Sequence, residues 1–192
     1  MSLFLHTERP ILQASETDEA LMKSFYGGSQ DAFSVVYSRY QERSVVYAWR
    51  ILRRREEAEE ISAEIWLKVA RGAWKPTGSF RSFLFTVLHR RCLDRIRQRQ
   101  RRIRLLPWVQ PPLFDGHTPE DAAVKDQRLF QLEAALAGLS DEQRTAVLLY
   151  YGEELSSREV AAIVGCTDQQ LRSRLSYARR KLRGVMLPAE TA

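Results

Sequence analysis

The placement of proline constrains the fold of this chain more than any other feature of its sequence. All seven prolines fall between segments of helical periodicity, and none lies inside such a segment. Proline has no backbone N–H and kinks or ends a helix when it lies in the interior. Apolar residues elsewhere recur at helical spacing, and no segment shows the alternation of a half-buried strand. The sequence therefore predicts an all-α protein.

The helical segments form two groups. Helices are expected at 18–26, from the N-cap Ser29 to 52, at 56–71, and after the N-cap Ser79. The pattern then collapses between Leu105 and His117, where prolines and a glycine indicate a linker. At 192 residues the chain is long enough for two small domains. We expect a domain at 18–104, a linker at 105–125 and a second domain at 126–186.

Capping motifs mark the helix starts of the second domain. Ser140, Ser156 and Thr167 are each followed three residues later by Gln or Glu, the pattern of a capping box. A further start is expected at Thr118-Pro119, with proline at the first helical position.

Residues 158–182 have the pattern of a helix-turn-helix. A short apolar helix ends at Gly165, where a positive φ is easiest, and a longer helix begins after Thr167. At about 100° per residue, Leu171, Leu175, Ala178 and Leu182 form one stripe that faces the core. The opposite face is polar, with cationic flanks, and suits the DNA major groove. The candidate DNA-binding residues of this helix are Arg172, Ser173, Arg174, Ser176, Tyr177, Arg179, Arg180 and Lys181. An ordinary helical hairpin with a solvated basic face is the alternative.

A run of arginines crowds the end of the preceding domain, and only Asp94 opposes it. Arginine is favoured where phosphate is bound in a bidentate fashion. Trp74 and two phenylalanines lie just upstream, where aromatic rings can stack on unpaired bases or belong to the core. We assign Phe80 and Phe83 to the core and leave both readings open for Trp74. The arginines are Arg90, Arg91, Arg95, Arg97, Arg99, Arg101, Arg102 and Arg104.

The helix at 56–71 carries the opposite charge in its first turns, from Glu56 to Glu60, with Glu64 following. Acidic residues are favoured at a helix start by its dipole, so this run can be a solvated helix end. It can also dock a basic protein partner, because an acidic helix repels the DNA backbone.

Composition narrows the function classes. The formal net charge of +6 favours an anionic partner such as nucleic acid. The two cysteines lie in apolar helical patterns, and the three histidines are scattered, so neither a metal site, a cofactor nor a catalytic residue is expected. No segment is long and apolar enough for a signal peptide or a membrane span. We expect a cytoplasmic protein that is not an enzyme.

Together these segments resemble a bacterial sigma factor of the extracytoplasmic function (ECF) group, from about Asp18 to Arg183. The family's successive blocks are similar to Ala32-Phe33 with Tyr37 and Tyr40, to 57–66, to 79–84 with 93–97, and to 171–182. The resemblance implies RNA polymerase binding through the β′ clamp helices and the β flap, promoter DNA as ligand, and control by an anti-sigma factor, since no sensor domain follows.

The resemblance also implies residue roles. The polymerase-binding residues would be Glu57, Glu59, Glu60, Glu64 and Trp66. The residues that melt and read the −10 promoter element would be Trp74, Lys75, Ser79, Arg90, Arg91, Arg95 and Arg97. The helix-turn-helix would read the −35 element, and the linker would thread toward the RNA exit channel.

Three positions depart from the family pattern. Ala63 replaces the usual Gln in the polymerase-binding block, Arg90 replaces a common Asn in the −10 block, and Tyr177 replaces a frequent Arg in the recognition helix. The family's standard contacts are not carried over at these positions. The rival hypothesis is a stand-alone helix-turn-helix regulator that dimerises through its N-terminal half, which leaves the acidic and arginine-rich helices unexplained.

Overall fold

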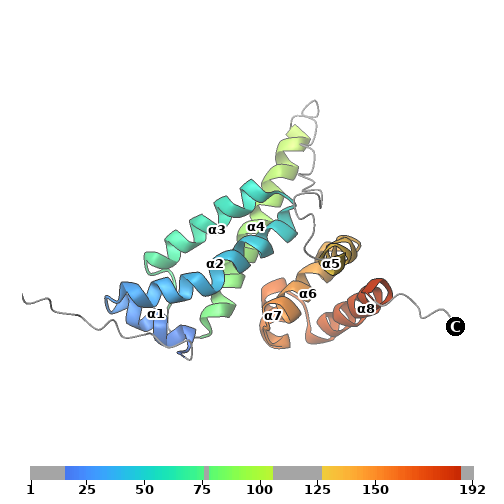
Figure 1. Cartoon of the computed structure of the whole chain (residues 1–192). Helices are drawn as coiled ribbons and strands as arrows, with labels where there is room; N and C mark the ends of the chain where they lie inside the picture. The colour runs from blue at the N-terminus through green and yellow to red at the C-terminus, as the bar shows by residue number, and fades with distance from the viewer. Residues whose placement is uncertain (1–15, 76–77, 106–126, 187–192) are drawn as a thin grey trace, which may run out of the picture.

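The computed structural model describes residues 16–75, 78–105 and 127–186, and within these ranges the chain is helical without a strand. The predicted all-α class is therefore confirmed. The first bundle contains α1 (Asp18–Tyr26), α2 (Gln30–Leu52), α3 (Arg55–Ala70) and α4 (Phe80–Leu105). The second contains α5 (Gln127–Ala137), α6 (Asp141–Val147), the π-helical turn η2 (Leu148–Gly152), α7 (Ser157–Val164) and α8 (Asp168–Met186) (Figure 1).

The helix starts follow the predicted caps. The Ser29 and Ser79 hydroxyls accept hydrogen bonds from the N–H groups of Ala32 and Ser82, at 3.4 and 3.2 Å. Both hydrogen bonds of a capping box are present at Ser140, Ser156 and Thr167. Each box satisfies backbone donors that have no partner within the helix. The predicted start at Thr118 and most of the expected linker lie outside the described residues.

The core of the first bundle is aromatic and contains a few paired polar groups. Trp66 donates its indole N–H to the Ser44 hydroxyl at 3.1 Å, and the Tyr47 hydroxyl lies 3.0 Å from Nδ1 of His89. Burial lowers the pKa of His89 to about 4, so the ring is neutral near pH 7. Phe80 is buried, as expected, and Cys92 is a buried free thiol.

The second bundle closes around α8, which packs on α5 and α6. The buried guanidinium of Arg144 donates to the carbonyls of Leu136 and Leu139, at 3.1 and 2.9 Å, and so satisfies groups at the end of α5. Gly165 adopts the left-handed conformation, φ 67°, and joins α7 to α8 as predicted.

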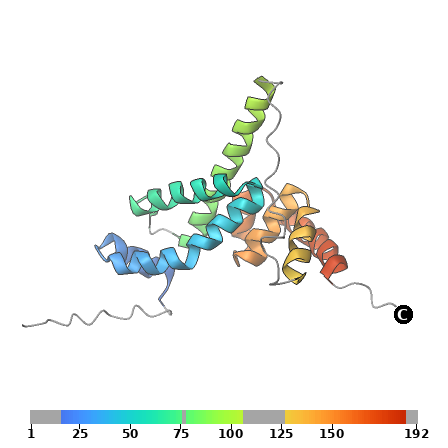
Figure 2. The same cartoon turned by 45° about the horizontal axis from the view of Figure 1, so that its top comes forward.

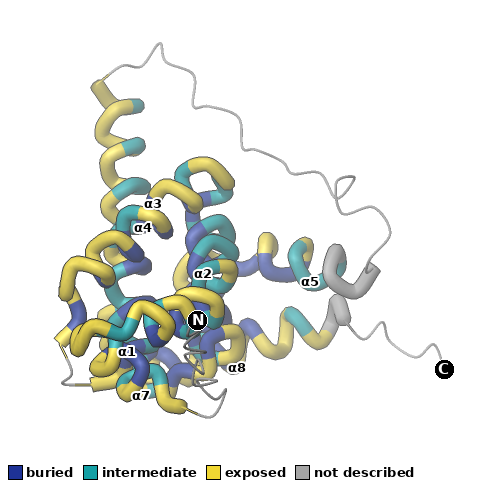
Figure 3. Tube along the Cα trace, turned by 60° about the vertical axis from the view of Figure 1, so that its left-hand side comes forward, coloured by how far each residue is buried: buried dark blue, intermediate teal, exposed yellow. Residues whose placement is uncertain are grey.

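The two bundles lie against each other, with α7 next to α4 and α6 next to α2. The last turns of α4 project beyond the rest of the first bundle in both views (Figures 1 and 2). Their residues are mostly exposed (Figure 3), so the arginine-rich end of α4 is a solvated arm. No helix of the described segments could span a membrane.

Candidate nucleic-acid interface

The recognition helix α8 presents the polar face that its periodicity predicts. Leu171, Leu175 and Ala178 are buried against the second bundle. The opposite side is exposed along its length, at Arg172, Ser173, Ser176, Tyr177, Arg179 and Arg180. The Arg180 guanidinium lies 5.5 Å from the Tyr177 ring centroid, and Arg172 pairs with Asp168 at 2.8 Å. This face combines hydroxyl groups with exposed cations, as major-groove recognition requires.

Two predicted DNA-binding residues of α8 are instead engaged within the second bundle. Arg174 is largely covered and pairs with Glu142 at 2.6 Å. The Lys181 ammonium donates to the carbonyl of Gly138, just beyond α5. Both residues lie on the flanks of the helix, where neighbouring helices compete with DNA for the side chain. Their positions indicate a structural role in this arrangement.

The acidic helix α3 and the arginine-rich helix α4 neutralise each other. Glu64 pairs with Arg91 at 2.8 Å and Glu60 pairs with Arg95 at 3.0 Å. One turn earlier along α3, Glu57 pairs with Arg99 at 2.9 Å. We call these three ion pairs the α3–α4 ladder. The hydrogen bond from Arg95 lowers the pKa of Glu60, so this carboxylate stays ionised.

Outside the ladder, each helix keeps exposed charges. Glu56 and Glu59 are exposed on α3, and Arg90 and Arg97 are exposed on α4. Arg97 pairs with Asp94 at 3.2 Å, and both side chains are largely solvated. Such an exposed pair is weak, so Arg97 remains available to another anion.

Two tryptophans expected at functional surfaces are core residues. Trp66, predicted to bind polymerase, is 4% exposed, and Trp74, for which base stacking was considered, is 3% exposed. The Trp74 ring stacks on Tyr26 and meets Phe80 edge-on. Neither indole is accessible to a partner in this arrangement. This corrects the direct polymerase contact expected of Trp66, and for Trp74 it favours the core reading that the sequence left open. The adjacent Lys75 and Ser79 are exposed.

Helix α1 holds both ends of the segment that joins α3 to α4, a feature that the sequence analysis missed. The Tyr26 hydroxyl donates to the carbonyl of Val69 at 3.0 Å, and Glu19 accepts the N–H of Phe80 at 2.8 Å. The sequence signal was weak, because an acidic residue in a first helical turn is common for other reasons.

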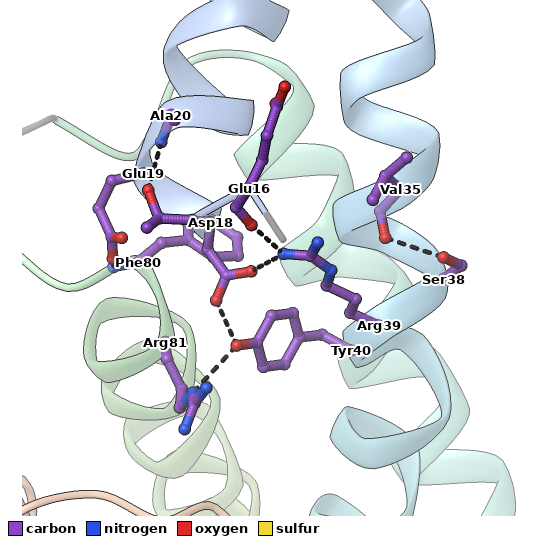
Figure 4. Close-up of polar contacts among 11 residues, drawn as sticks. Glu16, Asp18, Glu19, Ala20, Val35, Ser38, Arg39, Tyr40, Phe80 and Arg81 are labelled. Atoms are coloured by element: carbon purple, nitrogen blue, oxygen red, sulfur yellow. Dashed lines mark hydrogen bonds and ion pairs between the residues drawn. The ribbon is translucent and has the colours of Figure 1, made fainter. Parts of the chain in front are cut away.

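A polar network lies at the start of α1 and joins it to α2 and α4 (Figure 4). The Asp18 carboxylate accepts hydrogen bonds from Arg39, at 2.8 Å, and from the Tyr40 hydroxyl. The Tyr40 hydroxyl in turn accepts from Nε of Arg81 at 2.9 Å. Burial, reinforced by the hydrogen bond to Asp18, raises the pKa of Tyr40 to about 12. The other end of Arg81 donates to the carbonyl of Glu153 at 3.3 Å.

Ion pairs join the two bundles directly. Nη2 of Arg43 lies 2.9 Å from the carboxylate of Glu153, and Arg50 donates to Glu133 through Nε and Nη2, at 3.0 and 2.5 Å. Arg81 completes the set, with Glu154 at 3.5 Å. We call these contacts the interdomain clasp. Burial raises the pKa of Glu153 to about 7, although the neighbouring arginines act in the opposite direction.

Two sequence families match the chain, in the order of the two bundles. The family described as Sigma-70 region 2 matches residues 36–102, and the one described as Sigma-70, region 4 matches residues 129–182. The second match contains α7 and α8 as far as Leu182, and the first contains the α3–α4 ladder.

Similar proteins match over most of the chain. The ECF RNA polymerase sigma factor SigK of Mycobacterium tuberculosis (strain ATCC 25618 / H37Rv) is 30% identical over 175 residues, 88% of this chain and 92% of the relative. The protein of the same name in Mycobacterium sp. (strain KMS) is 29% identical over 177 residues, 88% of this chain and 90% of the relative.

Solved structures share the fold. The sigma factor RpoE of Bartonella quintana, in complex with the anti-sigma factor NepR, superposes with a TM-score of 0.68 at 22% identity, covering 82% of this chain and 98% of that chain. CnrH, in complex with the cytosolic domain of CnrY, has a TM-score of 0.62 at 18% identity and covers 92% and 100%.

Proposed function

Because the chain belongs to the ECF group of the sigma-70 family, we propose that its two bundles divide promoter recognition between them. The chain is an RNA polymerase sigma factor that directs transcription initiation at specific promoters. The observation that carries the division is the exposed polar face of α8, set in a different bundle from the exposed arginines of α4. We assign residues 18–104 to the polymerase-docking and −10 domain, 105–125 to a linker, and 126–186 to the −35 domain.

In this proposal the outer face of α3 docks on the β′ clamp helices. The exposed carboxylates Glu59 and Glu60 are the direct contacts, and half-exposed Leu67 adds apolar surface. Glu57 and Glu64 act through the α3–α4 ladder, and buried Trp66 supports the helix from below. An acidic helix suits a protein partner in a complex that also holds DNA, because its charge repels phosphate.

The −10 element is assigned to the start and the exposed side of α4. Lys75, Ser79 and Arg90 are exposed near the junction of α3 and α4, and Arg97 lies further along the arm. Arg91 and Arg95 join them when DNA phosphates compete with the carboxylates of the ladder. Trp74 acts as a support for this junction, since its ring is buried.

The −35 element is assigned to α8. Ser173, Ser176 and Tyr177 would meet base edges, and Arg172 would reach a base or a phosphate. Arg179 and Arg180 would bind phosphates, because they lie further toward the C-terminal end of the helix. Contact of the same domain with the β flap is part of the proposal.

We further infer control by an anti-sigma factor and a cytoplasmic location. One of the solved structures that share the fold, that of RpoE, is a complex with the anti-sigma factor NepR, which supports this class of partner without naming one. The protein contributes binding and positioning to initiation, and polymerase performs the chemistry. The stand-alone regulator hypothesis is not favoured by the matches to the sigma factor family.

One experiment tests the assignment. The purified chain is added to core RNA polymerase on genomic DNA, and the 5′ ends of the transcripts are sequenced. We expect a set of start sites that share two upstream sequence elements and require the added chain. Start sites that do not change on addition of the chain would contradict the proposal.

A further inference from the structure

Three arginines of the first bundle lie at its contact with the second bundle, and each one contacts oxygen atoms of the second bundle. Arg43 and Arg50 are seven residues apart on α2, which is about two helical turns, so they share one face of the helix. Arg43 meets Glu153 and Arg50 meets Glu133, at 2.9 and 2.5 Å. Arg81, at the start of α4, contributes a third cation through Glu153 and Glu154.

The contact between the bundles has the character of a separable interface. A pocket of about 240 Å³ that opens to solvent lies at this contact, and its lining combines Arg43, Arg50 and Glu153 with the apolar side chains of Val46 and Leu148. Two ion pairs border this pocket, and Oε2 of Glu133 is buried without a hydrogen-bond donor. Interfaces that are polar and incompletely packed resemble those of transient complexes, which open at low cost.

The promoter requires these bundles to separate. Elements centred near −10 and −35 are about 25 base pairs apart, or about 85 Å of duplex at about 3.4 Å per base pair. A domain of about 60 residues has a radius of gyration of only about 10 Å. Bundles in contact through Arg50 and Glu133 therefore cannot bind both elements at once. When they separate, all three arginines lose their carboxylate partners together.

We propose that the face formed by Arg43, Arg50 and Arg81 is a second phosphate-binding surface for promoter DNA, covered by carboxylates of the −35 domain until the bundles separate. The inference rests on the proposed function, because separation follows from the use of two promoter elements. In the closed arrangement the arginines bind the carboxylates of Glu133, Glu153 and Glu154. After the bundles separate, DNA phosphates take the positions of these carboxylates. Guanidinium groups bind carboxylate and phosphate with the same bidentate geometry, so one partner can replace the other.

The neighbours of the three arginines determine which of them can be substituted in a test. Glu42 of the first bundle also lines the pocket and is exposed. Arg81 is held by Tyr40, and Arg43 lies 5.3 Å from the centroid of the same ring. Substitutions at Arg43 and Arg81 thus disturb the core of the first bundle. Arg50 and Glu133 form the cleanest pair for a test, because each is partly solvated and each is the other's partner.

The test compares Arg50→Gln with Glu133→Gln in the full chain. Both substitutions remove the same ion pair and so loosen the clasp, but only the first removes a cation from the proposed surface. With core polymerase on a promoter found by transcript mapping, the salt dependence of binding is measured. Arg50→Gln is expected to lower the slope of log K against log[salt] by about 0.9, the value of one phosphate contact, whereas Glu133→Gln leaves it unchanged.

A second measurement is the affinity of the free proteins, without polymerase, for a duplex of 30 base pairs with a random sequence. Glu133→Gln is expected to bind this duplex more tightly than the parent, because the surface is uncovered, and Arg50→Gln is not. Equal behaviour of the two variants in both assays would overturn the proposal and leave a purely intramolecular clasp. Circular dichroism checks folding, and Arg50→Lys, which keeps the charge, should retain the slope. A parent chain that confers no promoter binding on polymerase would instead refute the proposed function, and this inference with it.

Discussion

The guanidinium of Arg91 lies 2.8 Å from the carboxylate of Glu64, so a residue assigned to promoter DNA neutralises one assigned to polymerase. In the next pair of the α3–α4 ladder, Arg95 likewise neutralises Glu60, a residue assigned to polymerase. Substitution at either helix therefore changes the charge presented by the other. Docking of α3 on polymerase and phosphate binding by α4 are electrostatically coupled through the ladder.

Reversal of charge at Glu60 and Glu64, to Arg at both positions, is expected to weaken association with core polymerase. The double variant loses the direct contact of Glu60, reverses the charge of Glu64, and releases Arg91 and Arg95 from their partners. Binding of a −35 duplex by the second bundle should not change, because the ladder lies wholly in the first. Association is measured by competition with a labelled parent chain for core polymerase.

The matched control is Glu56→Arg, which reverses an exposed charge on α3 outside the ladder. If the double variant retains full polymerase association, the acidic helix is only a solvated face. If Glu56→Arg is as damaging as the double variant, net charge rather than the ladder determines docking.

Arg172→Ala and Arg174→Ala are expected to have different effects, although both remove an arginine from the recognition helix. The side chain of Arg172 is 70% exposed. If its contact with guanine is bidentate, the substitution should cost about 1–3 kcal/mol of binding free energy at one base position. Arg174 is 22% exposed and pairs with Glu142, so its loss should lower stability while base preference stays the same. Selection from randomised −35 elements, with urea denaturation of each variant, separates the two. A changed base preference for Arg174→Ala would show that its pairing with Glu142 yields to DNA.

Trp74→Ala is expected to destabilise the first bundle by about 3–5 kcal/mol, the usual range for deletion of a large buried aromatic side chain. The ring packs against Tyr26 and Phe80, and its removal leaves a cavity beside the junction of α3 and α4. Urea denaturation measures the change, and exposed Lys75→Ala serves as the neighbouring control. A variant that loses −10 binding at unchanged stability would instead favour direct stacking on a base.

Acid is expected to favour the closed arrangement of the two bundles through Glu153. Burial in the closed arrangement raises the pKa of this carboxyl to about 7. Once the bundles separate, we expect its pKa to return to the ordinary value of 4.5. The closed form therefore binds the proton more tightly, so its advantage is complete below pH 4.5 and is lost as the pH rises through 7. The other groups facing Glu153 are Arg43, Arg50, Arg81 and Tyr47.

The radius of gyration, measured by small-angle scattering, should accordingly increase between pH 6 and pH 8. Glu153→Gln cannot titrate and should remove this dependence. A parent chain with the same radius at both pH values, or a variant that keeps the change, would contradict the assignment to Glu153.

Much of the fold could be predicted because its signals are local. A capping box needs only a hydroxyl and a Gln or Glu three residues later, so Ser140, Ser156 and Thr167 were recognisable. The buried stripe from Leu171 to Ala178 follows from helical geometry alone. Gly165 was readable because few other residues adopt a positive φ without strain.

The features that were missed depend on contacts between distant parts of the chain. Whether Trp66 and Trp74 face a partner or the core depends on where α2 and α4 pack, which periodicity within one helix does not reveal. Pairing of Glu64 with Arg91 requires the alignment of α3 with α4, and the interdomain clasp requires the placement of two bundles. The left-handed conformation of Arg53, φ 58°, has no glycine to signal it, and no local sequence pattern marks the π-helical turn η2.

We expect the chain to recognise promoters only as part of polymerase. The most direct measurement is the affinity of the chain for a mapped promoter, against a scrambled duplex, with and without core polymerase at the same salt concentration. We expect the free chain to bind both duplexes weakly, with strong salt dependence, and the complex to prefer the promoter by at least about 10³-fold. Tight, sequence-specific binding of the whole promoter by the free chain would contradict the account and favour a stand-alone regulator.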